Sequence, residues 1–409
     1  MSFQQGLSGL NAASKQLEVI GNNVSNANTV GFKQARAEFA DVFANSLSGG
    51  GASQIGIGTK VSNVAQQFTQ GNITATNNSL DIAINGGGFF RMSNNGSITY
   101  SRNGQFQMDK FGYIVDAENK RLTGYTASNT GVLSTGAPAE ININTGDLQP
   151  SATATVVGLV NLDSRNSSLP AAGFDPTDPT TYNNSTAVTV FDSLGNSHTL
   201  QSFFVKTAPG AWNVYTAADG VSTTALPTPT ATLTFTGTGL TPTVTPSNAA
   251  PVSFAVTTGA TTPVPLTLDY SGSTQFGSNF SVNSLSQDGY TSGRLAGFNT
   301  GSDGTIIGRY TNGQSKTLGQ VVLANFINPN GLQSLGGNAW AESATSGASL
   351  VGTPNTGSLG VLQSSATEDS NVDLTAELVN MITAQRVYQA NAQTIKTQDQ
   401  VLQTLVNLR

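Results

Sequence analysis

Apolar residues recur at heptad spacing near the start of the chain. The pattern consists of Phe3, Leu10, Leu17 and Val24 at seven-residue steps, with the small or apolar Gly6, Ala13, Ile20 and Ala27 between them. It predicts an amphipathic helix over residues 3–24 with a coiled-coil-like seam. A helix of that length extends about 33 Å.

The end of the chain shows the same kind of pattern over a longer stretch. Steps of four and three residues connect Leu374, Leu378, Met381, Gln385, Tyr388, Ala392, Ile395, Asp399, Leu402 and Val406. Only Gln385 and Asp399 interrupt the apolar positions, so we expect a helix over about residues 372–408, roughly 55 Å long. This helix would be about 20 Å longer than the N-terminal one.

Neither terminal helix can cover its apolar positions alone. The two helices could pair as an antiparallel hairpin within one chain, but the difference in length would leave apolar surface that a neighbouring chain would cover. We therefore expect self-association. The candidate assembly interface comprises Phe3, Leu10, Leu17, Ile20, Val24, Leu374, Leu378, Met381, Tyr388, Ile395, Leu402 and Val406.

Between the helices the pattern changes to short alternating runs and turn signals, which predict β-hairpins over residues 80–125 and 305–326. The middle of the chain contains a strong hairpin signal, VTVFDSLGNSHTLQSFFVK, followed by a Thr/Pro-rich tract in which proline can occupy only edges and turns. We interpret residues 145–284 as an inserted β domain.

The predicted fold class is α+β, with paired terminal helices and two mainly β domains, the outer one inserted in the inner one. Residues 1–30 and 370–409 would form the helical domain, and residues 71–144 and 285–357 the inner β domain. The outer domain would cover 145–284, and flexible linkers 31–70 and 358–369 would join the helices to the β body.

The stretch NNVSNANTVGFK, residues 22–33, ends the N-terminal helix. Asn and Ser side chains can bond the backbone groups freed at a helix end, and Asn and Gly both tolerate the left-handed turn that follows. Together with the Gly-rich stretch after it, this segment predicts a joint between helix and β body. The candidate hinge residues are Asn22, Asn23, Asn26, Thr29, Gly31, Phe32, Gly49, Gly50 and Gly51.

Composition excludes several classes of function. The net charge is −6, and only 17 Lys and Arg are spread along 409 residues, so no basic stripe exists for nucleic acid. Cysteine is absent, which excludes disulfides and thiolate sites. The N-terminus lacks the features of a cleaved signal peptide, whereas the weakly charged Thr/Ser/Asn surface suggests an extracellular protein, so we expect export by a route without a cleaved signal.

Candidate enzyme chemistry is sparse, and we predict no catalytic, cofactor-binding or metal-binding residues. His198 lies in a predicted hairpin turn, and its expected role is structural or solvent-exposed. The triple glycine in INGGGFF lacks the Lys-Ser/Thr of a phosphate-binding loop and is expected to be a turn between strands. Asp175 and Asp178 lie in FDPTDP without calcium-loop spacing, so turns are again expected.

Several motifs resemble the axial proteins of the bacterial flagellum, the family of rod and hook proteins. They are NNVSNANTVGFK, GFFR at 88–91, YSRNGQFQMDKFGYIVD at 100–116, LTGY at 122–125 and the block SNVDLTAELVNMITAQRVYQANAQTIKTQDQVLQTL at 370–405. The length and the inserted domain resemble the hook members of the family. A distal rod protein of the same family and a secreted oligomeric adhesin that binds carbohydrate are the alternatives.

The resemblance implies a subunit of a curved, flexible, hollow helical homopolymer, a universal joint that transmits torque from rod to filament. It also implies export through the type III apparatus and contacts with the hook cap protein, the distal rod protein and the hook-filament junction protein. The C-terminal helix has an amide-rich, nearly neutral polar face, which suits a surface that polypeptide must pass. On this resemblance the candidate channel-lining residues are Gln393, Gln398, Gln400 and Gln403.

Overall fold

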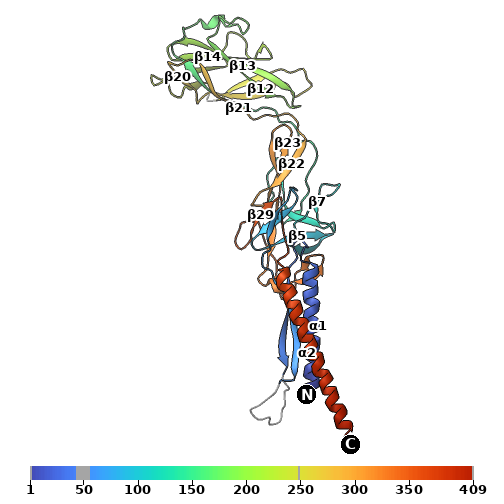
Figure 1. Cartoon of the computed structure of the whole chain (residues 1–409). Coiled ribbons are helices and arrows are strands. Elements are labelled where there is room, and N and C mark those ends of the chain that lie inside the picture. Colours follow the sequence, from blue (N-terminus) through green and yellow to red (C-terminus); the bar gives the residue numbers. More distant parts are fainter. Residues whose placement is uncertain (1, 43–55, 247–248, 408–409) are drawn as a thin grey trace. The chain divides into compact units, whose positions relative to one another are not determined.

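The computed structural model describes residues 2–42, 56–246 and 249–407. Its contacts divide the chain into two compact units. Unit 1 consists of 1–145, 297–309 and 315–409, and unit 2 consists of 146–296 and 310–314. Unit 1 contains two terminal helices packed together and several β-sheets, which confirms the predicted α+β class (Figure 1). The finer division into inner domain, outer domain and linkers stays a prediction.

The two helices are α1 (Ser2–Ser25) and α2 (Leu374–Asn407). They run antiparallel, because Gly6 lies against Ile395 and Gly9 against Asn391. The α1 face toward α2 includes Gly6 and Gly9, which allow the backbones to approach closely. The carboxylate of Asp373 caps α2 by accepting the backbone N–H groups of Thr375 and Ala376.

An antiparallel hairpin of β1 (Ala35–Val42) and β2 (Gly58–Gln66) packs on α1. The Ser8 hydroxyl contacts the start of β2 by accepting the Thr59 N–H at 3.3 Å. The predicted linker 31–70 thus contains this hairpin, which accounts for most of its described residues. The second predicted linker, 358–369, supplies two short strands. The flexibility of both segments stays a prediction.

The largest sheet of unit 1 follows the order β22-β23-β24-β9-β5-β6-β27-β26, with short strands paired beside it. Its main strands are β5 (Phe89–Asn94), β6 (Ser97–Ser101), β9 (Arg121–Thr126), β22 (Leu295–Thr300), β23 (Thr305–Tyr310), β24 (Ser315–Val321), β26 (Gln333–Gly336) and β27 (Ala339–Ala341). The strands beside it are β7 (Gln107–Met108), β8 (Ile114–Val115), β10 (Ala139–Glu140), β25 (Leu323–Asn325) and β28 (Leu350–Gly352). Two separate ladders pair β3 (Ile73–Ala75) with β30 (Ala366–Glu368) and β4 (Ile82–Asn85) with β29 (Val361–Ser364).

An aromatic cluster fills the core of unit 1. Phe89, Trp340 and Phe326 pack edge to face, and Phe68 joins them from the segment just after β2. The Trp340 indole N–H also donates to the Gln66 side chain at 2.5 Å. The end of the hairpin is thus anchored on the β body by packing and by a hydrogen bond.

Unit 2 is built from two sheets that share one core. The first sheet contains β11 (Thr155–Asp163), β18 (Ala249–Phe254), β19 (Val264–Asp269), β20 (Thr274–Phe276) and β21 (Ser281–Gln287). The second contains β12 (Asn184–Phe191), β13 (Ser197–Ala208), β14 (Ala211–Ala218), β15 (Val221–Ser222), β16 (Ala231–Thr234) and β17 (Thr243–Thr245). Trp212, Phe204 and Val160 from both sheets meet in this core.

The second sheet of unit 2 is covered on its other face as well. Phe174 stacks on Tyr215 and contacts Phe203 on that face. Residues of β13 and β14 therefore lie buried on both sides, which explains the continuous buried run SFFV in place of simple alternation. The predicted hairpin of β12 and β13 is confirmed, with Phe191 paired to Ser197 across the turn.

The predicted turns are also confirmed. The triple glycine lies between β4 and β5, and Gly86 and Gly88 have φ angles of +113° and +114°, which favour glycine. The carboxylates of Asp175 and Asp178 accept backbone N–H groups two residues later, from Thr177 and Thr180. Both aspartates act as local turn formers.

His198 has a structural role in unit 2. Its ring is largely buried and packs against Phe254. Nδ1 lies 2.7 Å from Asp219 Oδ2, and Nε2 lies 3.4 Å from Asp192 Oδ2, so an imidazolium can donate to a carboxylate on each side. Burial alone would lower the pKa of His198, but the bonds to Asp219 and Asp192 outweigh it and raise the pKa above its ordinary value of 6.5.

We expect the stability of unit 2 to depend on this protonation. Because the folded pKa is raised, the stabilisation is complete below pH 6.5 and is lost as the pH rises through the higher folded value. His198→Gln should remove this pH dependence and lower the free energy of unfolding at mildly acidic pH by about 1 to 3 kcal/mol. Trp212 fluorescence during urea unfolding, in a Trp340→Phe background, reports on unit 2.

The chain has a single histidine, so one ring resonance in NMR spectra gives its pKa directly. Asp219→Asn should lower that pKa. A folded pKa at or below 6.5, or the same pH dependence in His198→Gln, would contradict the assignment.

Candidate functional site: the helix pair and its junction with the β body

The residues of α2 that face α1 are small or polar. Glu377 and Ala384 are almost completely buried, and Asn391 and Gln398 continue the line at seven-residue spacing as half-buried residues. A Cβ at Gly9 would lie only 2.6 Å from the Asn391 side chain. The intrachain seam therefore uses small residues of α1 and leaves most of the larger apolar residues of α2 outside it, Ile395 excepted.

The predicted interface residues divide into two groups. Ile20 is buried, and Leu10, Leu17, Val24, Met381 and Ile395 are half-buried. Phe3, Leu374, Leu378, Tyr388, Leu402 and Val406 are exposed. The helices thus pair within one chain, as one of the two sequence hypotheses stated, and α2 still exposes most of its apolar side chains. Contacts of these residues with another chain stay a prediction.

The candidate channel residues do not share one face of α2. Gln393, Gln400 and Gln403 are exposed, whereas Gln398 is half-buried on the side toward α1. Because Gln398 follows Gln393 by five residues, it lies about 140° further around the helix. An amide-rich surface can therefore include Gln393, Gln400 and Gln403 but not Gln398.

The segment after α1 is a turn fixed by hydrogen bonds. Asn23 is buried and exchanges two bonds with the backbone of Ala35, at 2.8 and 2.9 Å. The Asn26 side chain donates to Asn22, and Thr29 donates to Asn26 at 3.3 Å. These bonds end α1 and set the direction in which the chain leaves it.

Gly31 forms the close contact at the end of this turn. Its φ angle is +71°, and a Cβ there would lie 2.5 Å from the Asn103 backbone nitrogen. The Gly31 N–H donates to the Glu368 carbonyl at 2.8 Å. Phe32 is half-buried beside it, and Gly49, Gly50 and Gly51 lie outside the described residues. Hinge motion at these positions stays a prediction.

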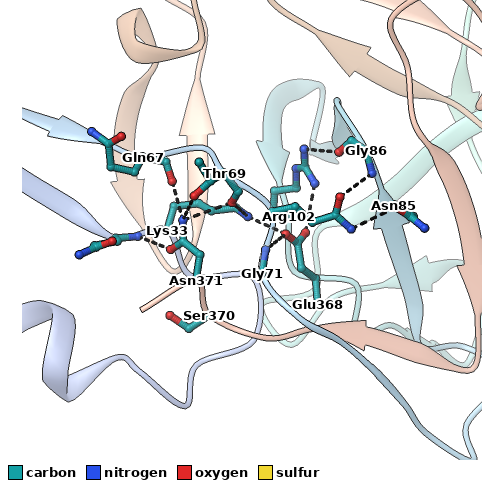
Figure 2. A network of polar contacts seen from close by, with 12 residues as sticks. Lys33, Gln67, Thr69, Gly71, Asn85, Gly86, Arg102, Glu368, Ser370 and Asn371 are labelled. Atoms are coloured by element: carbon teal, nitrogen blue, oxygen red, sulfur yellow. Dashed lines mark hydrogen bonds and ion pairs between the residues drawn. The ribbon is translucent and has the colours of Figure 1, made fainter. Parts of the chain in front are cut away.

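A buried ion triad joins three distant parts of the chain (Figure 2). Glu368 Oε1 accepts Lys33 Nζ at 2.6 Å, and Oε2 accepts an Arg102 guanidinium nitrogen at 3.1 Å. All three side chains are almost completely buried. Lys33 comes from the segment after α1, Arg102 from the β body and Glu368 from the end of β30. One carboxylate therefore connects both chain ends to the β body.

Backbone groups complete the triad. Glu368 Oε1 also accepts the Gly71 N–H at 2.9 Å. Lys33 Nζ donates to the Thr69 carbonyl, and Arg102 donates to the Gly86 carbonyl, both at 2.8 Å. These bonds compensate for part of the cost of removing three charges from water.

The triad contains two cations and one anion. Burial lowers the pKa of Lys33, the Glu368 carboxylate opposes that effect, and the nearby Arg102 adds to the lowering. Burial also lowers the pKa of Arg102 against the attraction of Glu368. Arg102 lies over the Phe89 ring, 5.4 Å from its centre, which gives the guanidinium a further favourable contact. Glu368 is thus the counter-ion of both cations.

Asn371 forms a second connection between the chain ends. Its side-chain oxygen accepts the Gln34 N–H at 2.7 Å, and its amide donates to the Gln67 carbonyl at 2.8 Å (Figure 2). The segment before α2 is therefore bonded to both ends of the β1–β2 hairpin. Both helices leave the β body from one bonded junction.

Sequence reasoning missed the roles of Glu368, Arg102 and Asn371. The bonds of Glu368 reach 335 and 266 positions along the chain, so no local period records them. A usable signal is the rarity of charge, since only 10% of residues are charged. Lys33 and Arg102 both lie inside the quoted motifs, where a buried partner of opposite charge could have been sought.

The described residues contain no cluster of His, Cys, Asp or Glu suited to a metal ion. No helix within 2–42, 56–246 or 249–407 is long and apolar enough to span a membrane. The contacts of the junction fix two helices on a β body.

We expect Glu368→Gln to destabilise unit 1 by about 3 to 5 kcal/mol, because it leaves two buried cations without a counter-ion. Glu140→Gln is a matched control, since its pair with Arg121 is partly exposed and screened by water, so that its loss should lower the free energy of unfolding far less. Trp340 fluorescence during urea unfolding, in a Trp212→Phe background, measures both. If both variants lowered the free energy of unfolding by the same small amount, the triad would not be needed for the stability of unit 1.

Four family models match successive parts of the chain. They describe a flagella basal body rod protein (residues 3–33), the hook protein FlgE/F/G D1 domain (83–160), the basal body protein FlaE D2 domain (161–290) and the rod FlgEFG protein C-terminal region (363–408). The Helicobacter pylori flagellar hook protein FlgE2 has a similar structure, with a TM-score of 0.53, 15% identity and coverage of 72% of this chain and 99% of that chain. That likeness concerns the fold alone.

Relatives that match over their full length are also flagellar hook proteins. The chain is 43% identical to the flagellar hook protein FlgE of Escherichia coli and 44% identical to that of Salmonella typhimurium, in each case over 100% of both chains. It is 32% identical to the hook protein of Borreliella burgdorferi over 100% of this chain and 99% of that one. The chain therefore belongs to the family of flagellar hook proteins, structural subunits of the flagellar hook rather than enzymes.

Proposed function

We propose that copies of this chain assemble through their helix pairs into a curved, flexible, hollow tube that transmits torque from rod to filament. The exposed apolar surface of α2 carries this proposal. Leu378, Ile382 and Leu402 are each exposed by about half, at 49%, 52% and 54%. Such a surface on an isolated helix face is typical of a protein-protein interface.

The lengths of the helices support the same conclusion. α2 has 34 residues and α1 has 24, so about 15 Å of α2 extends without a helical partner of equal length. The intrachain seam also covers only one side of α2. Association with other copies would bury the remaining apolar side chains and stabilise the tube through the hydrophobic effect.

In this tube the helix pairs form the inner wall. Gln393, Gln400 and Gln403 line the channel, where neutral amides let an exported polypeptide pass without holding it by charge. Unit 1 β-sheets and unit 2 form the outer layers. Bending then changes contacts between polar β surfaces of neighbouring copies, while the helix seams stay packed.

The partners follow from the place of such a tube in the flagellum. The chain would be exported through the type III apparatus without a cleaved signal peptide and added beneath a hook cap protein. The first copies would contact the distal rod protein, and the last copies would contact the hook-filament junction protein. No nucleic acid and no membrane insertion are involved.

We expect Leu378→Asp combined with Leu402→Asp to abolish assembly, because each charge would be buried without a partner in the helix wall. Leu335→Asp is a matched control, since Leu335 is similarly exposed (53%) but lies in the β body. Electron microscopy after salting-out scores hollow tubes, and urea unfolding checks that unit 1 stays folded. Tubes of normal form from the double variant would refute the helix-wall assignment.

Deleting about residues 145–284 should still permit a tube but change its curvature or stiffness, because the inner wall is retained and an outer layer is lost. Curvature is measured on negatively stained polymers. Curved tubes identical to those of the full chain would refute the role given to the outer layer.

A further inference from the structure

Glu377, in the first turns of α2, is a buried carboxylate with only one of its two oxygens bonded. It is 3% exposed. Oε1 accepts the side-chain amide of Gln34 at 2.5 Å, whereas Oε2 has no hydrogen-bond partner among the described residues. A buried anion that is half satisfied is costly, so a donor beside Oε2 would stabilise it considerably.

Glu377 lines a cavity of about 720 Å³ between α1, β1 and the start of α2. Most of the lining side chains are polar, including Gln16, Asn23, Gln67 and Asn380. The rim residues Arg36 and Asn380 are exposed and can turn aside. The cavity is therefore large and polar enough to take the end of a cationic side chain.

The opposite face of α2 presents an isolated cation. Arg386 forms no ion pair within the described residues, and it follows the exposed Val379 and Ile382 by seven and four residues, on the same face. Covering these apolar side chains would also remove water from the guanidinium, which would then need an anion. From Gln389 onward this face carries amides, so the channel surface begins beyond the apolar part.

Other carboxylates of the helix pair already have partners. Glu18 pairs with Lys15, Asp373 caps α2, and Asp399 accepts the Gln403 amide. Within the described helix pair, Glu377 is the acidic residue whose unbonded oxygen is buried, whereas the others are exposed and can bond water. Its charge and shape complement those of Arg386.

The two residues cannot meet within one chain. They are nine residues apart on a continuous helix, which places them roughly 14 Å apart along the axis and on opposite faces. Only Arg386 of a second copy can reach Glu377. A contact between opposite faces of identical chains is heterologous, and such contacts propagate into open helical polymers rather than closed dimers.

We propose that the cavity beside Glu377 is an assembly site that binds the Arg386 guanidinium of a neighbouring copy. Oε2 is closed to solvent in the single chain, so the Glu377 carboxylate turns on assembly to present it to the guanidinium while Gln34 keeps its bond. Val379 and Ile382 of the incoming helix pack at the rim. This inference rests on the proposed tube, because it specifies one of the contacts between its copies.

Glu377→Gln and Arg386→Gln test the site, since Gln at 377 keeps an acceptor for Gln34. Each should raise the critical concentration for tube formation, measured by sedimentation, by about tenfold or more. The double variant should be no worse than either single one. Lys396→Gln is the control, a cation on α2 outside the proposed contact, and it should leave assembly nearly unchanged.

A mixing experiment tests that the contact joins separate copies. Glu377→Arg and Arg386→Glu chains should each fail to assemble alone, and an equal mixture should form tubes because contacts between alternating copies then pair opposite charges. If either reversed chain does not fold, the Gln variants decide. Unchanged assembly of Glu377→Gln or Arg386→Gln would overturn the site.

Arg36 provides the test for a partner within the same chain. The proposal is wrong, and Arg36 is the donor, if two results are found together. The effects of Arg36→Gln and Glu377→Gln on the free energy of unfolding of the monomer are non-additive, and Arg386→Gln leaves the critical concentration for assembly unchanged. If the unaltered chain forms no tubes, the proposed assembly itself fails. Tubes from the unaltered chain and equally from Glu377→Gln would contradict only the Glu377 contact.

Discussion

The carboxylate of Glu368 is the interaction on which the arrangement of unit 1 depends. It is the counter-ion of both Lys33 after α1 and Arg102 in the β body, and it also accepts the Gly71 N–H. The backbone of the same residue accepts the Gly31 N–H. Both helices therefore leave the β body from a junction that is stable only when its single anion is in place. In a polymer wall, this constraint would give every copy the same helix direction.

The composition of the helix seam explains how one chain can be folded and still ready to assemble. Gly6 and Gly9 on α1 lie against Ile395 and Asn391, and the buried Ala384 is small, so the intrachain pair uses little of the apolar surface of α2. Larger residues such as Leu378 and Leu402 remain outside. A seam of leucines would have stabilised the single chain more, but it would have left less surface for neighbouring copies.

Features with a short sequence period could be predicted, and contacts over long separations could not. Heptads gave both helices to within a few residues, and the β12–β13 hairpin followed from its turn signal and flanking strands. The side of α2 that faces α1 was predicted less well, because Glu377 and Asn391 are polar and a hydrophobicity pattern ignores them. The Glu368 triad escaped prediction for the same reason: its members are charged residues from three segments.

Hydrogen exchange of the isolated chain tests the junction most directly. The backbone amides of Gly31 and Gly71 both donate to Glu368 in a buried setting. We expect peptides covering 29–34 and 69–73 to exchange as slowly as the buried strand β5. Exchange as fast as that of the exposed turn at Gly96 would contradict the claim that Glu368 fixes both chain ends on the β body.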